Sequence, residues 1–445
     1  MPKIVILGAG SGFGGRLSVD IMSRPALQDS TICLCDIHAE RLDKVQAYVR
    51  RTIAKHNLPT QLEVSLDRRE VLPGADFVIT SVSVGGGAYY GFPFSAEVGI
   101  PRKYGVDQSV ADTVSPGAVF RFLRTGPVQQ QFLRDMEELC PDALVLNHTN
   151  PMCMLTWLHS VDTSIRNVGI CHGVQETTRR LAGWAGVPYA ELSFLCAGIN
   201  HLAWILELKR GNEDLYPRIR ALLDDPEKTK GEEVRFEILK HFGYFSTESN
   251  RHDSEYLPYF RRTPELREYF KLPSREVPEE APTAREWLRD AAPGSPEGGP
   301  VGELRLSHEY TSGIMEAVVT GVPYTFNGNV MNTGLIANLP EGCCVEVPCM
   351  VDRRGVSPCH VGALPAHLAA LDRSNIAVQE LAVQAVLNRD REAAFHACCL
   401  DPLTAGVLPL HKIREMFEEL WEAEKHLLTW FDPAHTGRVP ETCAA

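Results

Sequence analysis

Two side chains thirty residues apart could together hold a metal ion. Cys171 follows a short apolar run, and His201 stands in the segment 198–204. A cysteine thiolate and a histidine imidazole can bind one divalent cation, with oxygens of a substrate filling the remaining positions. The spacing is also typical of a buried cysteine and a hydrogen-bonded histidine, so other residues must support a metal site.

A glycine-rich loop near the start of the chain could bind a dinucleotide. It follows the apolar run 3–7, and two registers of the pattern Gly-x-Gly-x-x-Gly overlap in it. In the first, Gly8 would make the tight turn and Gly10 would let the backbone approach a pyrophosphate, while Phe13 replaces the third glycine. The second register starts at Gly10 and is complete. The loop residues expected at the cofactor are Gly8, Gly10, Ser11, Gly12 and Phe13.

An acidic residue ends the next apolar run. Asp36 follows residues 32–35, about 20 residues past the glycine loop, where a carboxylate can bind the ribose hydroxyls of a dinucleotide. This position favours NAD over NADP. A glycine turn that binds no cofactor is the alternative interpretation.

Two polar loops follow apolar runs further along the chain. Residues 143–146 lead into a loop that contains Asn150, and residues 167–170 lead into Cys171 and His172. In open α/β sheets, ligands bind beyond the carboxyl ends of the strands, so these loops and the glycine loop are expected at one edge of the sheet. The polar side chains could instead only cap the helices that follow.

The elements that must position these residues alternate between strands and helices. Helices are expected between the strands, for example at 40–55. This alternation predicts an α/β fold with an N-terminal Rossmann-type doubly wound parallel sheet. The strands are expected at 3–7, 32–35, 62–64, 75–82, 143–146 and 167–170.

The pattern changes after residue 197. Helical periodicity dominates 307–321 and 374–388, with an extended piece at 344–347, which indicates a mixed α+β arrangement. We therefore expect an NAD-binding domain at 1–197 and a C-terminal α+β domain for substrate, metal and oligomerisation at 198–445. A stretch rich in Pro, Glu and Arg at 263–302 is predicted to be a mobile surface insertion.

The composition limits the partners and the compartment. The 445 residues carry 44 Lys and Arg against 57 Asp and Glu, and the net charge of −13 argues against nucleic acid as a partner. The 13 cysteines show no Cys-x-x-Cys pair, which is typical of a reducing compartment. No stretch approaches the roughly 18 apolar residues of a membrane helix. A soluble cytoplasmic protein with no membrane partner is expected.

Several motifs, taken in order, resemble those of glycoside hydrolase family 4. The resemblance covers nearly the whole chain and rests on the ordered combination rather than on one motif. The matching segments include Gly8-Ala9-Gly10-Ser11, Lys103-Tyr104-Gly105, Asp112-Thr113, Arg124-Thr125, Asn150-Pro151, Cys171-His172-Gly173-Val174, Gly198-Ile199-Asn200-His201, Glu255-Tyr256 and Asn338-Leu339-Pro340.

The resemblance implies an enzyme that hydrolyses glycosides with NAD and a divalent metal, usually Mn²⁺, in place of two catalytic carboxylates. Oxidation of the sugar at C3 makes the C2 proton acidic enough for a base to remove. The leaving group then departs from C1, water adds, and the hydride returns to C3. The family also implies a small-molecule glycoside as partner and a homodimer or homotetramer.

The resemblance also suggests roles for individual residues. Cys171 and His201 would be the metal ligands, Asn150 would bind the sugar hydroxyls, and His172 would donate a proton to the departing oxygen. A structural histidine is the alternative for His172. The base at C2 is expected in the segment 249–256, with Asp253 as first choice and Tyr256 and His252 as alternatives.

The substrate is expected to be an unphosphorylated α-glycoside. No arginine lies between residues 84 and 101, where phosphoglycosidases of the family carry one for the 6-phosphate. Gly173 resembles the third position of the α-glucuronidases, so α-glucuronides come first, with Arg251, Arg261 and Arg262 as candidates to bind the carboxylate. An α-galactosidase, α-glucosidase or α-galacturonidase of the same family is the alternative.

Two interpretations from other classes stay open. A 2-hydroxy-acid dehydrogenase of the malate or lactate dehydrogenase type has a similar fold and an Asn-Pro loop like Asn150-Pro151. Such an enzyme would release NADH stoichiometrically and would not need the Cys171 and His201 pair. A catalytically silent NAD-binding sensor is the other alternative, against which the presence of the complete candidate site argues.

Overall fold

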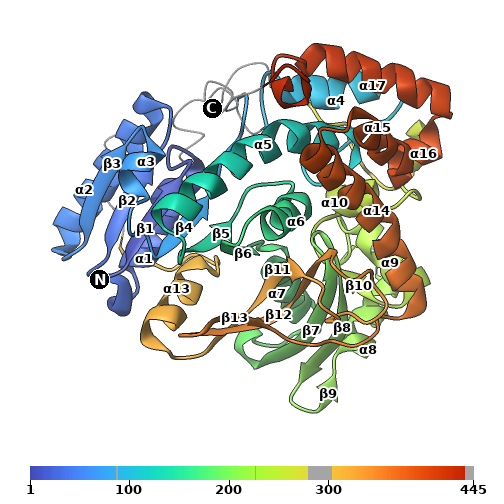
Figure 1. The fold of residues 1–445 in the computed structure, drawn as a ribbon. Coiled ribbons are helices and arrows are strands. Elements are labelled where there is room, and N and C mark those ends of the chain that lie inside the picture. The colour runs from blue at the N-terminus through green and yellow to red at the C-terminus, as the bar shows by residue number, and fades with distance from the viewer. Residues whose placement is uncertain (87–88, 226, 279–302, 436–445) are drawn as a thin grey trace.

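One sheet runs through the whole molecule (Figure 1). The computed structural model describes residues 1–86, 89–225, 227–278 and 303–435. In that part of the chain the strand order is β10-β8-β7-β12-β11-β6-β5-β4-β1-β2-β3, with β13 paired to β12 and β9 paired to β8. The sheet therefore has a parallel half, β1 to β6, and a half with antiparallel pairing.

The parallel half has the strand order 3-2-1-4-5-6. Between β1 and β4 the order in which successive strands are added reverses, which is the switch point where ligands bind in such sheets. The pairs of this half are parallel throughout, for example Ile4 with Ile32 and with Phe77. This confirms the predicted doubly wound Rossmann-type sheet. The strands are β1 (Lys3–Leu7), β2 (Thr31–Cys35), β3 (Gln61–Ser65), β4 (Phe77–Thr80), β5 (Leu144–Asn147) and β6 (Arg166–Gly169).

Helices cover both faces of the parallel half because its central strands are apolar on both sides. In β1, Ile4 and Ile6 pack in the same cluster as α1 and α2, whereas Val5 and Leu7 pack with α5 on the opposite face. The helices of this half are α1 (Gly12–Met22), α2 (Ala39–His56), α3 (Arg68–Val71), α4 (Phe94–Lys103), α5 (Ser115–Leu139), α6 (Met152–Asp162) and α7 (Gly173–Ala185).

The antiparallel half continues the same sheet. Strand β11 pairs with β6 at Asn329 and Gly169, and β12 pairs with β7 at Glu346 and Gly198. Strand β7 runs across residue 197, and the predicted domain boundary there stays a prediction. The strands are β7 (Leu192–Ile199), β8 (Leu202–Arg210), β9 (Glu213–Asp214), β10 (Phe245–Ser246), β11 (Tyr324–Met331), β12 (Cys344–Asp352) and β13 (Gly355–Pro358).

The last helices fold back onto the first half. A buried apolar cluster joins α14, α15 and α17 to α5 and α6, which lie close together in Figure 1. The remaining helices are α8 (Tyr216–Arg220), α9 (Glu233–Phe242), α10 (Asn250–Tyr256), α11 (Pro264–Tyr269), α13 (Thr311–Thr320), α14 (Ala366–Asn388), α15 (Arg391–Leu400), α16 (Pro402–Val407) and α17 (Leu410–Glu424).

The predicted mobile insertion, 263–302, falls largely outside the described residues, which omit 279–302. Its described part contains α11 and contacts residues that precede α5 in the chain. Arg267 pairs with Asp107, and the Gly91 N–H donates to the carbonyl of Pro278 over 2.7 Å. None of the helices in the described ranges is long and apolar enough to span a membrane.

Candidate active site

The glycine loop turns sharply between β1 and α1. Gly8 has φ +81°, and a Cβ there would lie 2.1 Å from the carbonyl oxygen of Ser81, at the end of β4. Ser11 at the N-terminus of α1 makes no side-chain cap, and the first turn of α1 carries no acidic residue. The positive end of the helix dipole is therefore available to an anionic group such as a pyrophosphate.

Asp36 lies directly against the glycine loop. Its Oδ2 accepts the Gly10 N–H over 2.7 Å, and its Oδ1 accepts the His38 N–H over 2.9 Å. A Cβ on Gly10 would lie 2.7 Å from the same Oδ2, so the glycine allows this close approach. Each carboxylate oxygen can accept a further hydrogen bond, as ribose hydroxyls would require.

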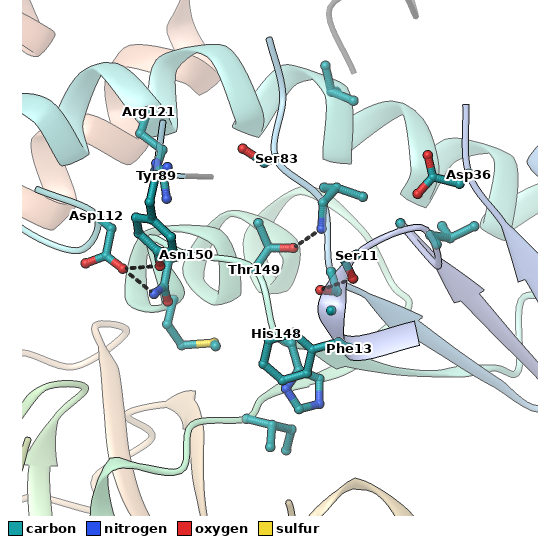
Figure 2. Close-up of a pocket in the computed structure, with 18 of the residues that line it drawn as sticks. Ser11, Phe13, Asp36, Ser83, Tyr89, Asp112, Arg121, His148, Thr149 and Asn150 are labelled. Carbon is teal, nitrogen blue, oxygen red and sulfur yellow. Dashed lines mark hydrogen bonds between the residues drawn. The ribbon is translucent and has the colours of Figure 1, made fainter. Parts of the chain in front are cut away.

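A cavity of about 580 Å³ lies beyond the carboxyl ends of the parallel strands. Figure 2 shows Ser11 and Asp36 at one end and Asp112 and Asn150 at the other, with Phe13 between them beside His148. The cavity thus joins the glycine loop to the two polar loops, as predicted for one edge of the sheet. The predicted residues that line it are Gly8, Ser11, Gly12, Phe13, Asp36, Asn150, Cys171, His172, His201 and His252.

His201 lies in the turn between β7 and β8, which places it beside Cys171. Ile199 pairs with Leu202, so Asn200 and His201 form a two-residue hairpin turn, and His201 has φ +65°. Such strain in a non-glycine residue is typical of functional positions. The His201 Nε2 lies 3.3 Å from the Cys171 Sγ.

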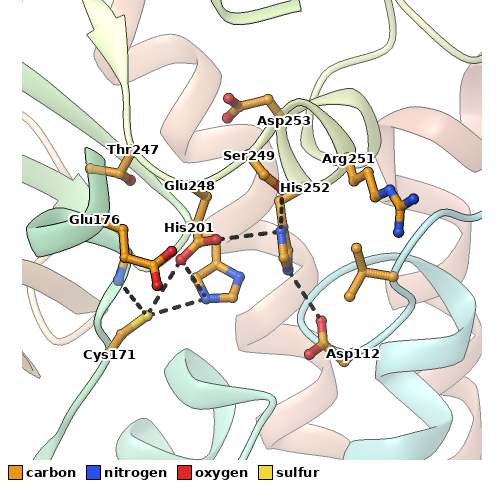
Figure 3. A network of polar contacts seen from close by, with 12 residues as sticks. Asp112, Cys171, Glu176, His201, Thr247, Glu248, Ser249, Arg251, His252 and Asp253 are labelled. Atoms are coloured by element: carbon orange, nitrogen blue, oxygen red, sulfur yellow. Dashed lines mark hydrogen bonds and ion pairs between the residues drawn. The ribbon is translucent and has the colours of Figure 1, made fainter. Parts of the chain in front are cut away.

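Glu248 completes a group of three possible metal ligands with Cys171 and His201 (Figure 3). Its Oε1 lies 3.4 Å from the His201 Nε2 and 3.6 Å from the Cys171 Sγ. Burial lowers the pKa of His201 to about 4, so the imidazole is neutral, as a metal ligand must be. Burial and the Glu248 charge hold the pKa of the Cys171 thiol well above its ordinary value.

This donor set fits a divalent cation. A buried thiol beside an ionised carboxylate can lose its proton only when a positive charge compensates both groups. A sulfur, an imidazole and a carboxylate suit transition metals such as manganese or zinc better than magnesium.

His172 lines the cavity and lies beside Glu309, which is buried. Its Nδ1 is 3.5 Å from a Glu309 carboxylate oxygen, and this interaction raises the pKa of His172 to about 9. The half-exposed imidazole is therefore positively charged at neutral pH and carries a proton that it can donate.

Asn150 does not cap the helix that follows it. Pro151 occupies the N-cap of α6, and the Asn150 Nδ2 instead donates to the Asp112 Oδ2 over 2.9 Å. The Tyr89 hydroxyl donates to the same oxygen over 2.9 Å. The Asp112 carboxylate is buried, and although burial would raise its pKa, His252, His201 and Arg121 hold the pKa below its ordinary value.

Asp253 does not lie at the cavity. Its Oδ2 accepts the Ser246 hydroxyl over 2.8 Å, and Figure 3 shows its carboxylate pointing away from Cys171 and His201. Burial raises its pKa well above the ordinary value, which favours the neutral acid. Tyr256 is also buried and lies outside the cavity lining.

His252 is the one residue of the three base candidates that lines the cavity. Its Nδ1 lies 3.4 Å from a Glu248 oxygen, and its Nε2 lies 3.7 Å from the Asp112 Oδ1. Burial would lower the pKa of His252, but these two carboxylates outweigh burial and raise the pKa to about 9.

The three arginines predicted for a substrate carboxylate lie outside the cavity lining. Arg261 is buried and donates to the carbonyl of Asp107 over 2.7 Å. The buried Arg121 lines the cavity instead, with its guanidinium 5.3 Å from the centre of the Tyr89 ring.

Sequence reasoning missed three acidic residues of this site. Glu248, Glu309 and Asp112 lie in loops, and they are far along the chain from His201, His172 and Asn150, respectively, which they contact. For Asp112 the signal was present, because it stands in one of the matching motifs. Glu248 lies one residue before the segment in which the base was expected.

Family models match most of the chain. The model described as "Family 4 glycosyl hydrolase" matches residues 3–187, and "Family 4 glycosyl hydrolase C-terminal domain" matches residues 196–404. An α-galactosidase of Bacillus subtilis (strain 168) is 40% identical over 434 residues, which are 95% of this chain and 98% of that protein. An α-galactosidase of Rhizobium meliloti (strain 1021) is 35% identical over 438 residues, 95% of this chain and 88% of that protein.

A solved structure shares the fold. The 6-phospho-α-glucosidase from gut microorganisms, crystallised in complex with NAD and Mn²⁺, superimposes with a TM-score of 0.75. It is 19% identical, and the match covers 95% of this chain and 98% of that one.

Proposed function

Because the chain belongs to family 4 of the glycosyl hydrolases, we propose that it hydrolyses unphosphorylated α-glycosides with bound NAD and a divalent metal ion, Mn²⁺ first. The observation that carries the proposal is a single cavity lined by the glycine loop with Asp36 and by Cys171 with His201. The 6-phospho-α-glucosidase of the same fold binds NAD and Mn²⁺, which supports both cofactors.

The chain's own residues divide the work of binding. The loop from Gly8 to Phe13 and Asp36 hold the dinucleotide, and Cys171 and His201 hold the metal. Asn150 binds sugar hydroxyls through its side-chain oxygen, because its Nδ2 is engaged by Asp112. When bound, the NAD and metal would supply reversible oxidation at C3 and polarisation of the resulting carbonyl.

Two histidines move protons. His172 donates to the oxygen that leaves C1, since it lines the cavity beside Glu309. His252, which alone of the three base candidates lines the cavity, takes the proton from C2 in its neutral form. Because its pKa is raised to about 9, this form is the minority at neutral pH and its share grows as the pH rises. We therefore assign the role of the base at C2 to His252 instead of Asp253.

We place α-galactosides first among the substrates. The relatives that are 40% and 35% identical are α-galactosidases, and Arg251, Arg261 and Arg262 lie outside the cavity lining. The α-glucuronides remain a second candidate, favoured by Gly173 and by the guanidinium of Arg121 at the cavity.

The test is the release of p-nitrophenol from the α-galactoside, α-glucoside, α-glucuronide and α-galacturonide, with NAD⁺, Mn²⁺ and a thiol. Release that stops when either NAD⁺ or Mn²⁺ is omitted supports the proposal, and the preferred sugar decides between the two substrate classes. Reaction in D₂O should place deuterium at C2 of the product sugar. Release without NAD⁺, or product without deuterium, would contradict the proposed mechanism.

A further inference from the structure

Glu248 lies close enough to Cys171 and His201 to share one metal ion with them. The three distances among the Cys171 Sγ, the His201 Nε2 and the Glu248 Oε1 are 3.3, 3.4 and 3.6 Å. Donors that share one metal ion, each bound at about 2.0–2.3 Å, lie roughly 3.0–3.6 Å apart. The three atoms are therefore close enough together to bind one ion.

The backbone beside the ligand cysteine makes room for this carboxylate. A Cβ on Gly173 would lie 2.1 Å from the Glu248 Oε1 and 2.9 Å from its carboxyl carbon. The Gly173 N–H also donates to the Cys171 Sγ over 3.4 Å, so this residue cannot move away independently of the ligand. A side chain at position 173 would push the Glu248 carboxylate out of the group.

We propose that Glu248 is a third protein ligand of the divalent metal, and that the missing side chain at Gly173 keeps it in place. This inference rests on the proposed metal site at Cys171 and His201. It adds a carboxylate to a pair that the sequence had predicted alone.

The charges support three ligands. A thiolate and a carboxylate together neutralise a divalent cation, whereas the neutral His201 adds no charge.

The second oxygen of Glu248 faces the proposed base. Oε2 lies 3.4 Å from the His252 Nδ1, while Oε1 faces Cys171 and His201. One carboxylate thus connects the metal site to His252. A competing group, which consists of Asp112, His201 and His252, shares His201 with the first.

The test is Mn²⁺ binding to the purified full-length protein, measured from the EPR signal of free Mn²⁺ at one fixed pH. We expect Glu248→Gln to weaken Mn²⁺ binding by at least about tenfold. Gly173→Ser keeps every charge and should weaken binding to a similar degree. Glu176→Gln is the matched control, since it removes an exposed carboxylate close to the site, and it should change the affinity less than about threefold.

The outcomes separate this inference from the proposed function. Absence of Mn²⁺ binding to the wild-type protein, or unchanged binding by Cys171→Ser, would overturn the metal site itself. Binding that Cys171→Ser abolishes but that Glu248→Gln and Gly173→Ser leave within twofold would overturn only the role of Glu248. Loss through Asp112→Asn without loss through Glu248→Gln would assign the metal to the competing group. Thermal unfolding of each variant checks that it is folded.

Discussion

At the scale of single residues, the segment 249–256 shows what a sequence can and cannot define. The resemblance placed the base in this segment but could not tell which side chain faces the cavity. Neighbours on a helix point about 100° apart, so in α10 His252 turns toward Asp112 while Asp253 turns toward Ser246. That orientation depends on how α10 packs against α9 and α16, which no local pattern reveals.

The same limit explains the missed acids. Cys171, His201 and the glycine loop were found because their residue types are rare or their spacing is regular. A lone glutamate such as Glu248 or Glu309 resembles a surface residue until the fold buries it beside a histidine. Only the tertiary structure supplies that information.

The choice between His252 and Asp253 can be tested directly. His252→Gln should lower kcat by at least about 100-fold, since general-base catalysis typically contributes that much. Asp253→Asn should keep kcat within about threefold, because an amide of the same shape replaces a buried side chain that does not line the cavity. Deuterium incorporation at C2 from D₂O, measured for both variants, would show whether proton removal is the affected step. The opposite ranking would restore Asp253 as the base.

At the scale of elements, the glycine loop connects β1 to α1 at a point where only glycine fits. Gly8→Ala would bring a methyl group against the Ser81 carbonyl and would also force alanine into a left-handed conformation. We expect at least about tenfold weaker NAD⁺ binding and a loss of about 1–3 kcal/mol in the free energy of unfolding. Quenching of tryptophan fluorescence by NAD⁺ and denaturant unfolding measure the two effects.

Gly183 provides the matched control for that substitution. It lies within helix α7, and a Cβ there would have no atom within 4 Å. Gly183→Ala should leave NAD⁺ binding unchanged and stabilise the protein by up to about 1 kcal/mol. Equal effects of the two substitutions would show that the tight turn at Gly8 has no special role.

A buried aspartate between α16 and α5 should make the free energy of unfolding depend on pH. Asp401 caps α16, where its Oδ2 accepts the Thr404 N–H over 2.8 Å and the Thr404 hydroxyl over 2.6 Å. Burial raises the pKa of Asp401 from 3.8 to about 6. The folded state thus binds the proton more tightly than the unfolded state, so this stabilisation is complete below about pH 4 and is lost as the pH rises through 6.

Asp401→Asn keeps the cap and removes the titration. Relative to this variant, the wild-type protein should lose up to about 3 kcal/mol in the free energy of unfolding between pH 4 and pH 7. Urea unfolding at several pH values measures the difference. Asp390→Asn, at the exposed cap of α15, controls for loss of a capping carboxylate. A gap between wild type and Asp401→Asn that stays constant with pH would contradict the expectation.

At the scale of the whole molecule, the α/β class and the parallel half followed from strand and helix periodicity. The continuous sheet did not, because the pairing of β11 with β6 joins Asn329 to Gly169, 160 residues apart. Local patterns cannot specify such a contact. The expected homodimer or homotetramer likewise stays a prediction, which light scattering of the purified protein would test.

Continuity of the sheet predicts that the two halves unfold together. One buried cluster contains Ile4 from β1, Trp204 from β8 and Val345 from β12, so neither half can lose its core alone. Far-UV circular dichroism and tryptophan fluorescence should therefore give one coincident transition in urea. NAD⁺ at about 100 times its dissociation constant should shift that whole transition by about 2.7 kcal/mol. Two separate transitions, of which NAD⁺ moves only one, would instead support independent domains divided near residue 197.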